Sequence, residues 1–191
     1  SESRGLGDVY KRQLKNIWSQ FKKFIRFDQS TFIQISNDRY ESGNALIVVL
    51  LSLLSIYIPL VINASVVNIA DIIFYGVVDG IFAWLFANLA IWFLLSRAFS
   101  QQIEIPSLLV FTGYTHGLVG FIGVVVLINS LITIPAIFLQ ITTISIFAWM
   151  YFVLSKSLRS AFLFEDRVAS ITTVTFLLVL TLFSDPIRIF V

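Results

Sequence analysis

The sequence predicts an all-α integral membrane protein, a bundle of five transmembrane helices preceded by an amphipathic helix at the membrane surface. Hydrophobic residues make up 58% of the 191 residues and charged residues only 13%, whereas soluble domains have about 45–50% and about 25%. The charges gather near the beginning, so residues 1–44 form the predicted cytoplasmic head and residues 45–191 the membrane domain. The long apolar runs lack the alternation of barrel strands, which excludes a β-barrel.

The first predicted element is an amphipathic helix over residues 10–27. Its apolar residues recur every three or four positions, and its basic residues fall on the opposite side. We expect this helix to lie on an anionic leaflet with Trp18 at the boundary. The basic residues expected at the membrane surface are Lys15, Lys22, Lys23 and Arg26. The alternative is an ordinary amphipathic helix packed on a partner or on the bundle's own loops.

Two other segments of the head carry separate predictions. Residues 1–13 resemble adaptor or assembly-derived sequence, and the only methionine is Met150, so we expect this segment to be non-native. Residues 28–43 form a predicted polar connection to the first span, with Ser30 as a candidate helix cap.

Five spans follow, because the hydrocarbon core requires about 20 apolar residues for each crossing. There is no charge between Glu41 and Asp71, and 51 consecutive residues, 105–155, lack Asp, Glu, Lys and Arg. The second run is too long for one span and suits a tight hairpin of two. The predicted spans are residues 45–63, 72–95, 107–128, 135–154 and 168–183.

The basic residues predict the orientation. With the N-terminus cytoplasmic, 12 of the 13 lysines and arginines lie on the cytoplasmic side, and Arg188 alone lies on the other. This asymmetry predicts a cytoplasmic N-terminus and a C-terminus on the opposite side. The expected membrane is the plasma membrane in a prokaryote, or the ER or Golgi in a eukaryote.

Only two ionisable side chains, Asp79 and His116, lie within predicted spans. Counting 1.5 Å per residue from the span ends, their depths agree within about 4 Å. A contact between them across a helix interface is therefore allowed. Such a pair suits a proton or cation relay, because histidine titrates near neutrality. The structural alternative is a hydrogen bond that fixes the register of two helices, or an Asp79 that snorkels or is neutral.

The third span carries a face of small residues. On a helical wheel, Gly113, Gly117 and Gly120 lie within about 60°, and His116 and Gly123 border them. Such a groove lets another backbone approach closely. We expect it to be an internal interface of the bundle, and a homodimer seam is the alternative.

The composition excludes most chemistry. There is no cysteine and only one histidine, which excludes thiolate and multi-histidine metal sites. The sequence has no phosphate-binding glycine loop, nucleophile elbow or zinc-binding H-E-x-x-H motif. We therefore predict neither catalysis nor a cofactor. The basic excess lies beside apolar spans, so we expect anionic lipid headgroups rather than nucleic acid as its partner.

The layout resembles the Yip1 family, in particular its compact prokaryotic members. The resemblance covers residues 24–183 and rests on the head, the five-span pattern with its tight third and fourth spans, Gly113-Tyr114, and the charged loop Lys156–Arg167. Leu118 and its neighbours replace the proline that often follows the Gly-Tyr pair in that family. The acidic-Gly-Pro element, associated with Rab binding in eukaryotic members, has no counterpart, which argues against a GTPase partner.

The resemblance implies a polytopic protein without catalysis. We therefore predict a scaffold or adaptor that organises the membrane or partner proteins, with a membrane-protein partner or a second copy of the chain. The alternatives are a small transporter or proton-coupled permease subunit that uses Asp79 and His116, and an accessory subunit of a larger membrane complex.

Overall fold

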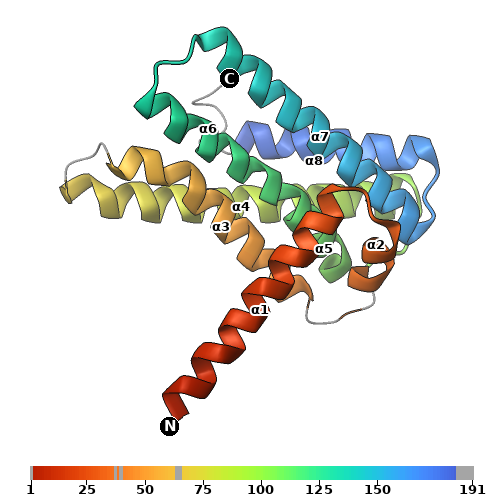
Figure 1. Ribbon diagram of the computed structural model, residues 1–191. Helices are drawn as coiled ribbons and strands as arrows, with labels where there is room; N and C mark the ends of the chain where they lie inside the picture. Colours follow the sequence, from red (N-terminus) through yellow and green to blue (C-terminus); the bar gives the residue numbers. More distant parts are fainter. Residues whose placement is uncertain (1, 37, 39–40, 63–65, 184–191) are drawn as a thin grey trace.

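The predicted all-α class is confirmed. In a computed structural model, residues 2–36, 38, 41–62 and 66–183 are described, and they form helices joined by short connections, with no strand among them (Figure 1). The helices are α1 (Glu2–Ile25), α2 (Gln29–Ser36), α3 (Glu41–Ile62), α4 (Val66–Ala98), α5 (Ile105–His116), α6 (Gly120–Leu131), α7 (Ala136–Phe162) and α8 (Asp166–Phe183). A short 3₁₀ helix, η1 (Gly117–Val119), joins α5 to α6.

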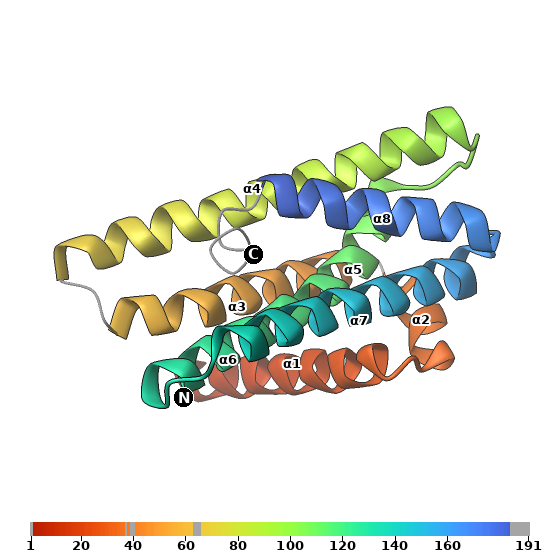
Figure 2. The same cartoon turned by 90° about the horizontal axis from the view of Figure 1, so that it is seen from above.

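The long helices run up and down in one bundle. α4 packs against α8, and α3 packs against both α5 and α6 (Figure 2). One end of the bundle gathers α2, the connection from α4 to α5 and the turn from α7 to α8, whereas the turn from α6 to α7 lies at the other end (Figures 1 and 2). The N-terminal half of α1 extends away from the other helices (Figure 1).

Four helical segments are long and apolar enough to cross a membrane. They are Phe74–Ala98 of α4, Ile105–Leu131 of α5, η1 and α6, Ala136–Phe162 of α7, and Asp166–Phe183 of α8. The predicted first span corresponds to α3, which counts as a fifth crossing only when it is joined to α2 across a bend of 116°. Asn63, the predicted end of that span, and Arg188 lie outside the described residues.

Two helices extend furthest beyond their predicted spans. α7 continues to Phe162 instead of ending at Leu154, because its last turns are amphipathic: Leu158 is buried while Lys156 and Arg159 are exposed. α4 covers 66–98 instead of 72–95. Hydropathy marks the part of a helix that is apolar, and a helix ends only where its backbone hydrogen bonding ends.

The polar connection predicted over residues 28–43 was wrong in part, because it contains α2. Phe32 and Ile35 on this helix are almost completely buried, and that packing outweighs the polar composition. The cap is Asp28 rather than Ser30: Asp28 Oδ1 accepts from the Ser30 backbone N–H at 3.1 Å and from its hydroxyl at 2.8 Å.

These hydrogen bonds have an electrostatic consequence. The hydroxyls of Ser30 and Thr31 donate to the Asp28 carboxylate and hold the pKa of Asp28 below its ordinary value. The cap therefore stabilises the start of α2 at any pH above the ordinary carboxyl pKa. It is lost as the pH falls through the lowered pKa of the folded protein.

α1 differs from its prediction at both ends. It begins at Glu2 rather than residue 10, since two glycines lower helix propensity without stopping a helix. It ends at Ile25 rather than residue 27, because Phe27 takes a left-handed conformation with φ of 64°. The Asp28 N–H then donates to the Lys23 carbonyl and the Phe27 N–H to the Phe24 carbonyl, which is the Schellman pattern that closes helices.

All four glycines of the predicted packing face lie against other helices. A Cβ at Gly113 would approach the Ala45 Cβ to 2.8 Å, and one at Gly120 would lie 3.2 Å from the Ser52 Cα. A Cβ at Gly123 would collide with the backbone carbonyl of Ser55. Gly117 faces the side chains of Val48 on α3 and Phe21 on α1. The backbones of α3 and the α5–η1–α6 segment can therefore approach closely.

This packing predicts an asymmetry between two glycines. Gly123→Ala should destabilise the protein by about 1–3 kcal/mol, because the backbone of α3 has to move away. Gly43→Ala is the control, since nothing lies within 4 Å of a Cβ at Gly43, and it should leave stability unchanged or slightly raised. Denaturation of the purified proteins in detergent measures both. Equal stability of the two variants would contradict the close packing.

Candidate functional site

α1 is tied to the bundle by a buried cluster of three polar side chains. The Glu41 carboxylate, at the first turn of α3, accepts from Gln20 Nε2 of α1 at 2.8 Å and from the Tyr114 hydroxyl of α5 at 2.7 Å. The same hydroxyl lies 3.1 Å from Gln20 Oε1. Glu41 is 2% exposed and Tyr114 is fully buried. Three elements far apart in the sequence are thus joined at one carboxylate.

The location of this carboxylate explains how a buried charge is tolerated. A helix N-terminus carries unpaired backbone N–H groups and a partial positive charge, which stabilises an acidic side chain in the first turn. The two donors from Gln20 and Tyr114 satisfy both carboxylate oxygens. Removal of either donor would leave part of a buried charge unpaired, so the cluster specifies how α1 docks.

The apolar side of α1 faces protein along its C-terminal half. The buried residues are Ile17, Phe21, Phe24 and Ile25. The Phe24 ring packs against the rings of Phe32 and Tyr114, and Trp149 Nε1 of α7 donates to the Ile25 carbonyl at 3.1 Å. The structure therefore corrects the expectation that this whole face rests on lipid. Its C-terminal half packs on helices of the bundle, whereas the alternative interpretation placed it on a partner or on the bundle's loops.

The remaining face of α1 is open. Leu14 is 49% exposed and Trp18 is 56% exposed. The basic residues Lys15, Lys22, Lys23 and Arg26 are all exposed. Lys22 Nζ lies 5.9 Å from the centroid of the Trp18 ring, within the range of a cation–π contact. α1 therefore presents an aromatic and basic surface while its other side is held by the protein.

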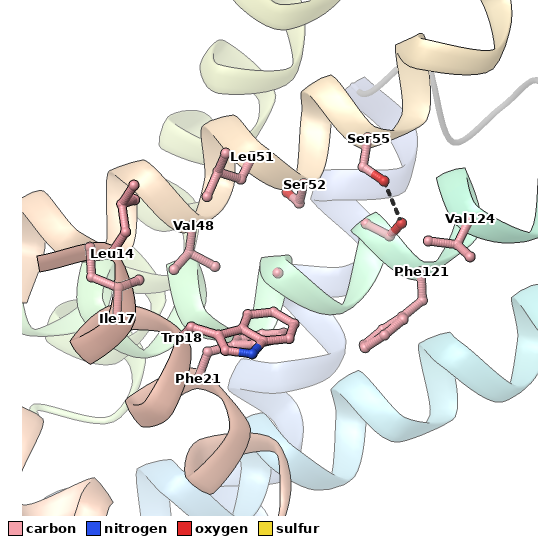
Figure 3. Close-up of a pocket in the computed structure, with 12 residues that line it drawn as sticks. Leu14, Ile17, Trp18, Phe21, Val48, Leu51, Ser52, Ser55, Phe121 and Val124 are labelled. Atoms are coloured by element: carbon pink, nitrogen blue, oxygen red, sulfur yellow. Dashed lines mark hydrogen bonds between the residues drawn. The ribbon is translucent and has the colours of Figure 1, made fainter. Parts of the chain in front are cut away.

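An apolar groove of about 210 Å³ lies between α1, α3 and the η1–α6 segment. Its lining residues come mostly from the apolar side of each helix. They are Leu14, Ile17, Trp18, Phe21, Val48, Leu51, Ser52, Ser55, Gly117, Gly120, Phe121 and Val124. In Figure 3, the Trp18 ring projects from α1 toward α6, and Leu51 and Val124 lie on the walls formed by α3 and α6. The glycines that let the helices pack closely also shape the floor of the groove.

His116 faces α3 and is fully buried. Its Nδ1 is 2.8 Å from Ser52 Oγ, and the Ser52 hydroxyl donates to the Val49 carbonyl. Ser52 Oγ therefore stands between the Val49 carbonyl and the imidazole Nδ1 and links His116 to the backbone of α3. Nε2 has no hydrogen-bond partner in the described part of the chain.

The structure does not join the predicted polar pair. His116 is hydrogen-bonded to Ser52 and not to Asp79. Asp79 is half-buried on α4 and makes an interaction of its own. Agreement in depth was not sufficient, because the close approach of α3 on the glycine side brings Ser52, rather than α4, against His116. The geometry on which a direct Asp79–His116 relay depends is therefore missing.

A second buried network joins α4 to α5. The Thr112 hydroxyl donates to Asn88 Oδ1 at 2.8 Å and accepts from Trp84 Nε1 at 3.2 Å. Asn88 Nδ2 in turn donates to the Trp84 carbonyl at 2.8 Å. All three side chains are buried. In a lipid environment such groups find partners only within the protein, so this network fixes the register of the two helices.

Sequence reasoning missed the residues that hold the site together, namely Gln20, Glu41 and Ser52. One signal was available for α3: Ala45, Ser52 and Ser55 are small residues three to seven positions apart, which is a stripe able to face glycines. Glu41 had no such signal, because a single acidic residue before an apolar run is usually solvated.

In the part of the chain that the structure describes, no group of three or more His, Asp or Glu side chains could hold a metal ion. No protein-family model, curated protein or solved structure matches the chain. The resemblance to the Yip1 family therefore has no support from these comparisons.

The buried cluster predicts that one hydroxyl controls the docking of α1. Tyr114→Phe should destabilise it by about 1–3 kcal/mol, because the Glu41 carboxylate loses a buried donor. Trypsin should then cut faster at Lys22 and Lys23, and thermal unfolding in detergent should begin earlier. Tyr75→Phe is the control, since Tyr75 is 68% exposed, and it should leave both measurements unchanged. A Tyr114→Phe protein as resistant as the wild type would refute the role of the cluster.

Proposed function

We propose that this chain is a non-enzymatic, five-span membrane protein that acts as a scaffold or adaptor for the membrane or for partner proteins. The observation that carries the proposal is the docking of α1. The Gln20–Glu41–Tyr114 cluster holds this helix at one end of the bundle, while its basic residues and Trp18 stay exposed. A surface held rigidly in this way is suited to binding a membrane or a partner protein rather than to turning over a substrate.

In this proposal α3 crosses the membrane by itself, without the bent α2, as the fifth span. It has 22 residues, which is within the range of about 17–25 that a membrane helix needs. Its only charged residue, Glu41, lies in the first turn, where it reaches the cytoplasmic interface. With α3 as the first span, the α4–α5 connection and the α7–α8 turn lie on the cytoplasmic side, where Arg97, Lys156 and Arg167 carry the charges expected there.

The exposed basic side of α1 suits anionic headgroups of the inner leaflet. A scaffold of this kind, similar in layout to Yip1-domain proteins, works in the plasma membrane of a prokaryote or in the ER or Golgi of a eukaryote. Its partner is another membrane protein or a second copy of the chain. An accessory subunit of a larger complex would need the same membrane location and the same kind of partner. The transporter alternative has lost the Asp79–His116 contact on which it depended.

Topology gives the first test of this proposal. A reporter fused after Val191 should be non-cytoplasmic, because five crossings place the two ends of the chain on opposite sides. A reporter inserted after Leu163, in the turn between α7 and α8, should be cytoplasmic and is the control. Alkaline phosphatase and green fluorescent protein fusions measure the two sides. A cytoplasmic signal after Val191 would contradict the five-span arrangement.

The scaffold role gives the second test. In native membranes, replacement of Lys15, Lys22 and Lys23 by Gln should shift the protein from a larger complex to a smaller one on native gels, because α1 loses its basic surface. The control is Arg97, Lys156 and Arg167→Gln, which removes the same charge from the same end without touching α1.

We expect no ion flux above that of empty vesicles when the wild type is reconstituted in proteoliposomes. Flux that disappears in Asp79→Asn would overturn the scaffold proposal.

A further inference from the structure

The groove beside α1 has the properties of a binding site for a hydrocarbon chain. None of its described lining residues is charged. Its two serine side chains already have partners: the Ser52 hydroxyl donates to the Val49 carbonyl, and the Ser55 hydroxyl donates to the Gly120 carbonyl at 2.9 Å (Figure 3). The other side-chain donor in the lining is the indole N–H of Trp18, a half-exposed residue. A polar ligand would therefore find few free hydrogen-bonding groups here, whereas an apolar one leaves both serines satisfied.

The size of the groove restricts the occupant to something thin. About 210 Å³ is below the roughly 300–1,000 Å³ of sites that enclose drug-sized ligands. An α-helix with its side chains is about 10–12 Å across, so a helix could place only single side chains in a space of this volume. A segment of one extended acyl chain is thin enough to lie in it, with the rest of the chain in the bilayer. The exposed sides of Leu51 and Val124 leave the groove open along the surface that faces lipid.

A positive charge lies at one edge of the groove. Trp18 is a lining residue, and the Lys22 ammonium lies 5.9 Å from its ring centroid. Lys22 is exposed, and its hydrogen-bonding capacity is available to a phosphate. Tryptophan beside lysine is also the pair of side chains that favours the headgroup level of a bilayer. The groove therefore joins an apolar cleft to a cationic edge, which matches an anionic amphiphile.

We propose that this groove is a discrete site for one anionic phospholipid of the inner leaflet. One acyl chain lies between α1, α3 and α6, and the headgroup phosphate is bound by Lys22. This inference rests on the membrane location in the proposed function. It adds a defined, stoichiometric ligand to the general attraction of α1 for an anionic surface. The bound chain completes the packing of α1 along the stretch where Leu14 and Trp18 are exposed.

The test uses the full chain, purified and delipidated in detergent. Dioleoyl phosphatidylglycerol or dioleoyl phosphatidylcholine is added, and native mass spectrometry counts the lipids retained. The wild type should retain one phosphatidylglycerol in preference to phosphatidylcholine. Val124→Trp fills the groove and should abolish this retention. Its control is Ile128→Trp, one turn further along α6, which is similarly exposed and does not line the groove.

A second pair of variants tests the headgroup contact. Lys22→Gln should lower the preference for phosphatidylglycerol about tenfold, because the phosphate loses a charge-assisted hydrogen bond. Lys23→Gln removes the same charge from the neighbouring position, away from the Trp18 ring, and should change the preference little. If Val124→Trp does not fold, Leu51→Trp fills the opposite wall and gives the same test.

The possible outcomes separate this site from the scaffold role. Loss of retention in Val124→Trp with an unchanged native complex supports the lipid site and shows that it is independent of partner assembly. Equal retention of the two lipids, or retention that Val124→Trp and Leu51→Trp leave unaltered, overturns the site and leaves the proposed scaffold function standing. Equal effects of Lys22→Gln and Lys23→Gln would show diffuse attraction and overturn the assignment of the phosphate to Lys22.

Discussion

The close approach of α3 to the α5–η1–α6 segment is the constraint on which the rest of the molecule depends. Lipid chains are as apolar as leucine side chains, so burial of apolar area does not drive helices together inside a membrane. Packing has to provide the attraction, and a gap of about 0.5–1 Å already loses a quarter to a half of the dispersion energy. Glycines at 113, 120 and 123 bring the backbones together. The same packing places Ser52 against His116 and Glu41 against Tyr114.

Polar side chains then determine which of several similar packings is adopted. Glu41 with Tyr114 and Gln20, and Thr112 with Asn88 and Trp84, form networks in which each member depends on a residue from another helix. A slip of one residue would leave a buried group without its partner, at a cost larger than the contribution of the bond itself. The glycines set how close the helices lie, and these networks set the register.

The sequence predicted how deep each apolar segment lies along the bundle better than which neighbouring helix each face contacts. Hydropathy located the apolar parts of α4 to α8, and the helical wheel grouped Gly113, Gly117 and Gly120 on one face. The Asp79–His116 contact was predicted from depth alone, and depth does not say which helix lies beside a face. α2 was missed because its eight residues have only a few buried side chains, such as Phe32 and Ile35. Tertiary packing, rather than local pattern, forms so short a helix.

α1 shows how protein and lipid share one amphipathic surface. Its C-terminal half has protein contacts, including Phe24 against Tyr114 and Trp149 against the Ile25 carbonyl, whereas Leu14 and Trp18 remain exposed beside the groove. The apolar side of α1 is longer than the part that protein covers. The uncovered part of that side needs another apolar partner. In a bilayer that partner is an acyl chain, and the groove bounded by Gly117, Gly120 and Val124 is the place where the chain can reach it.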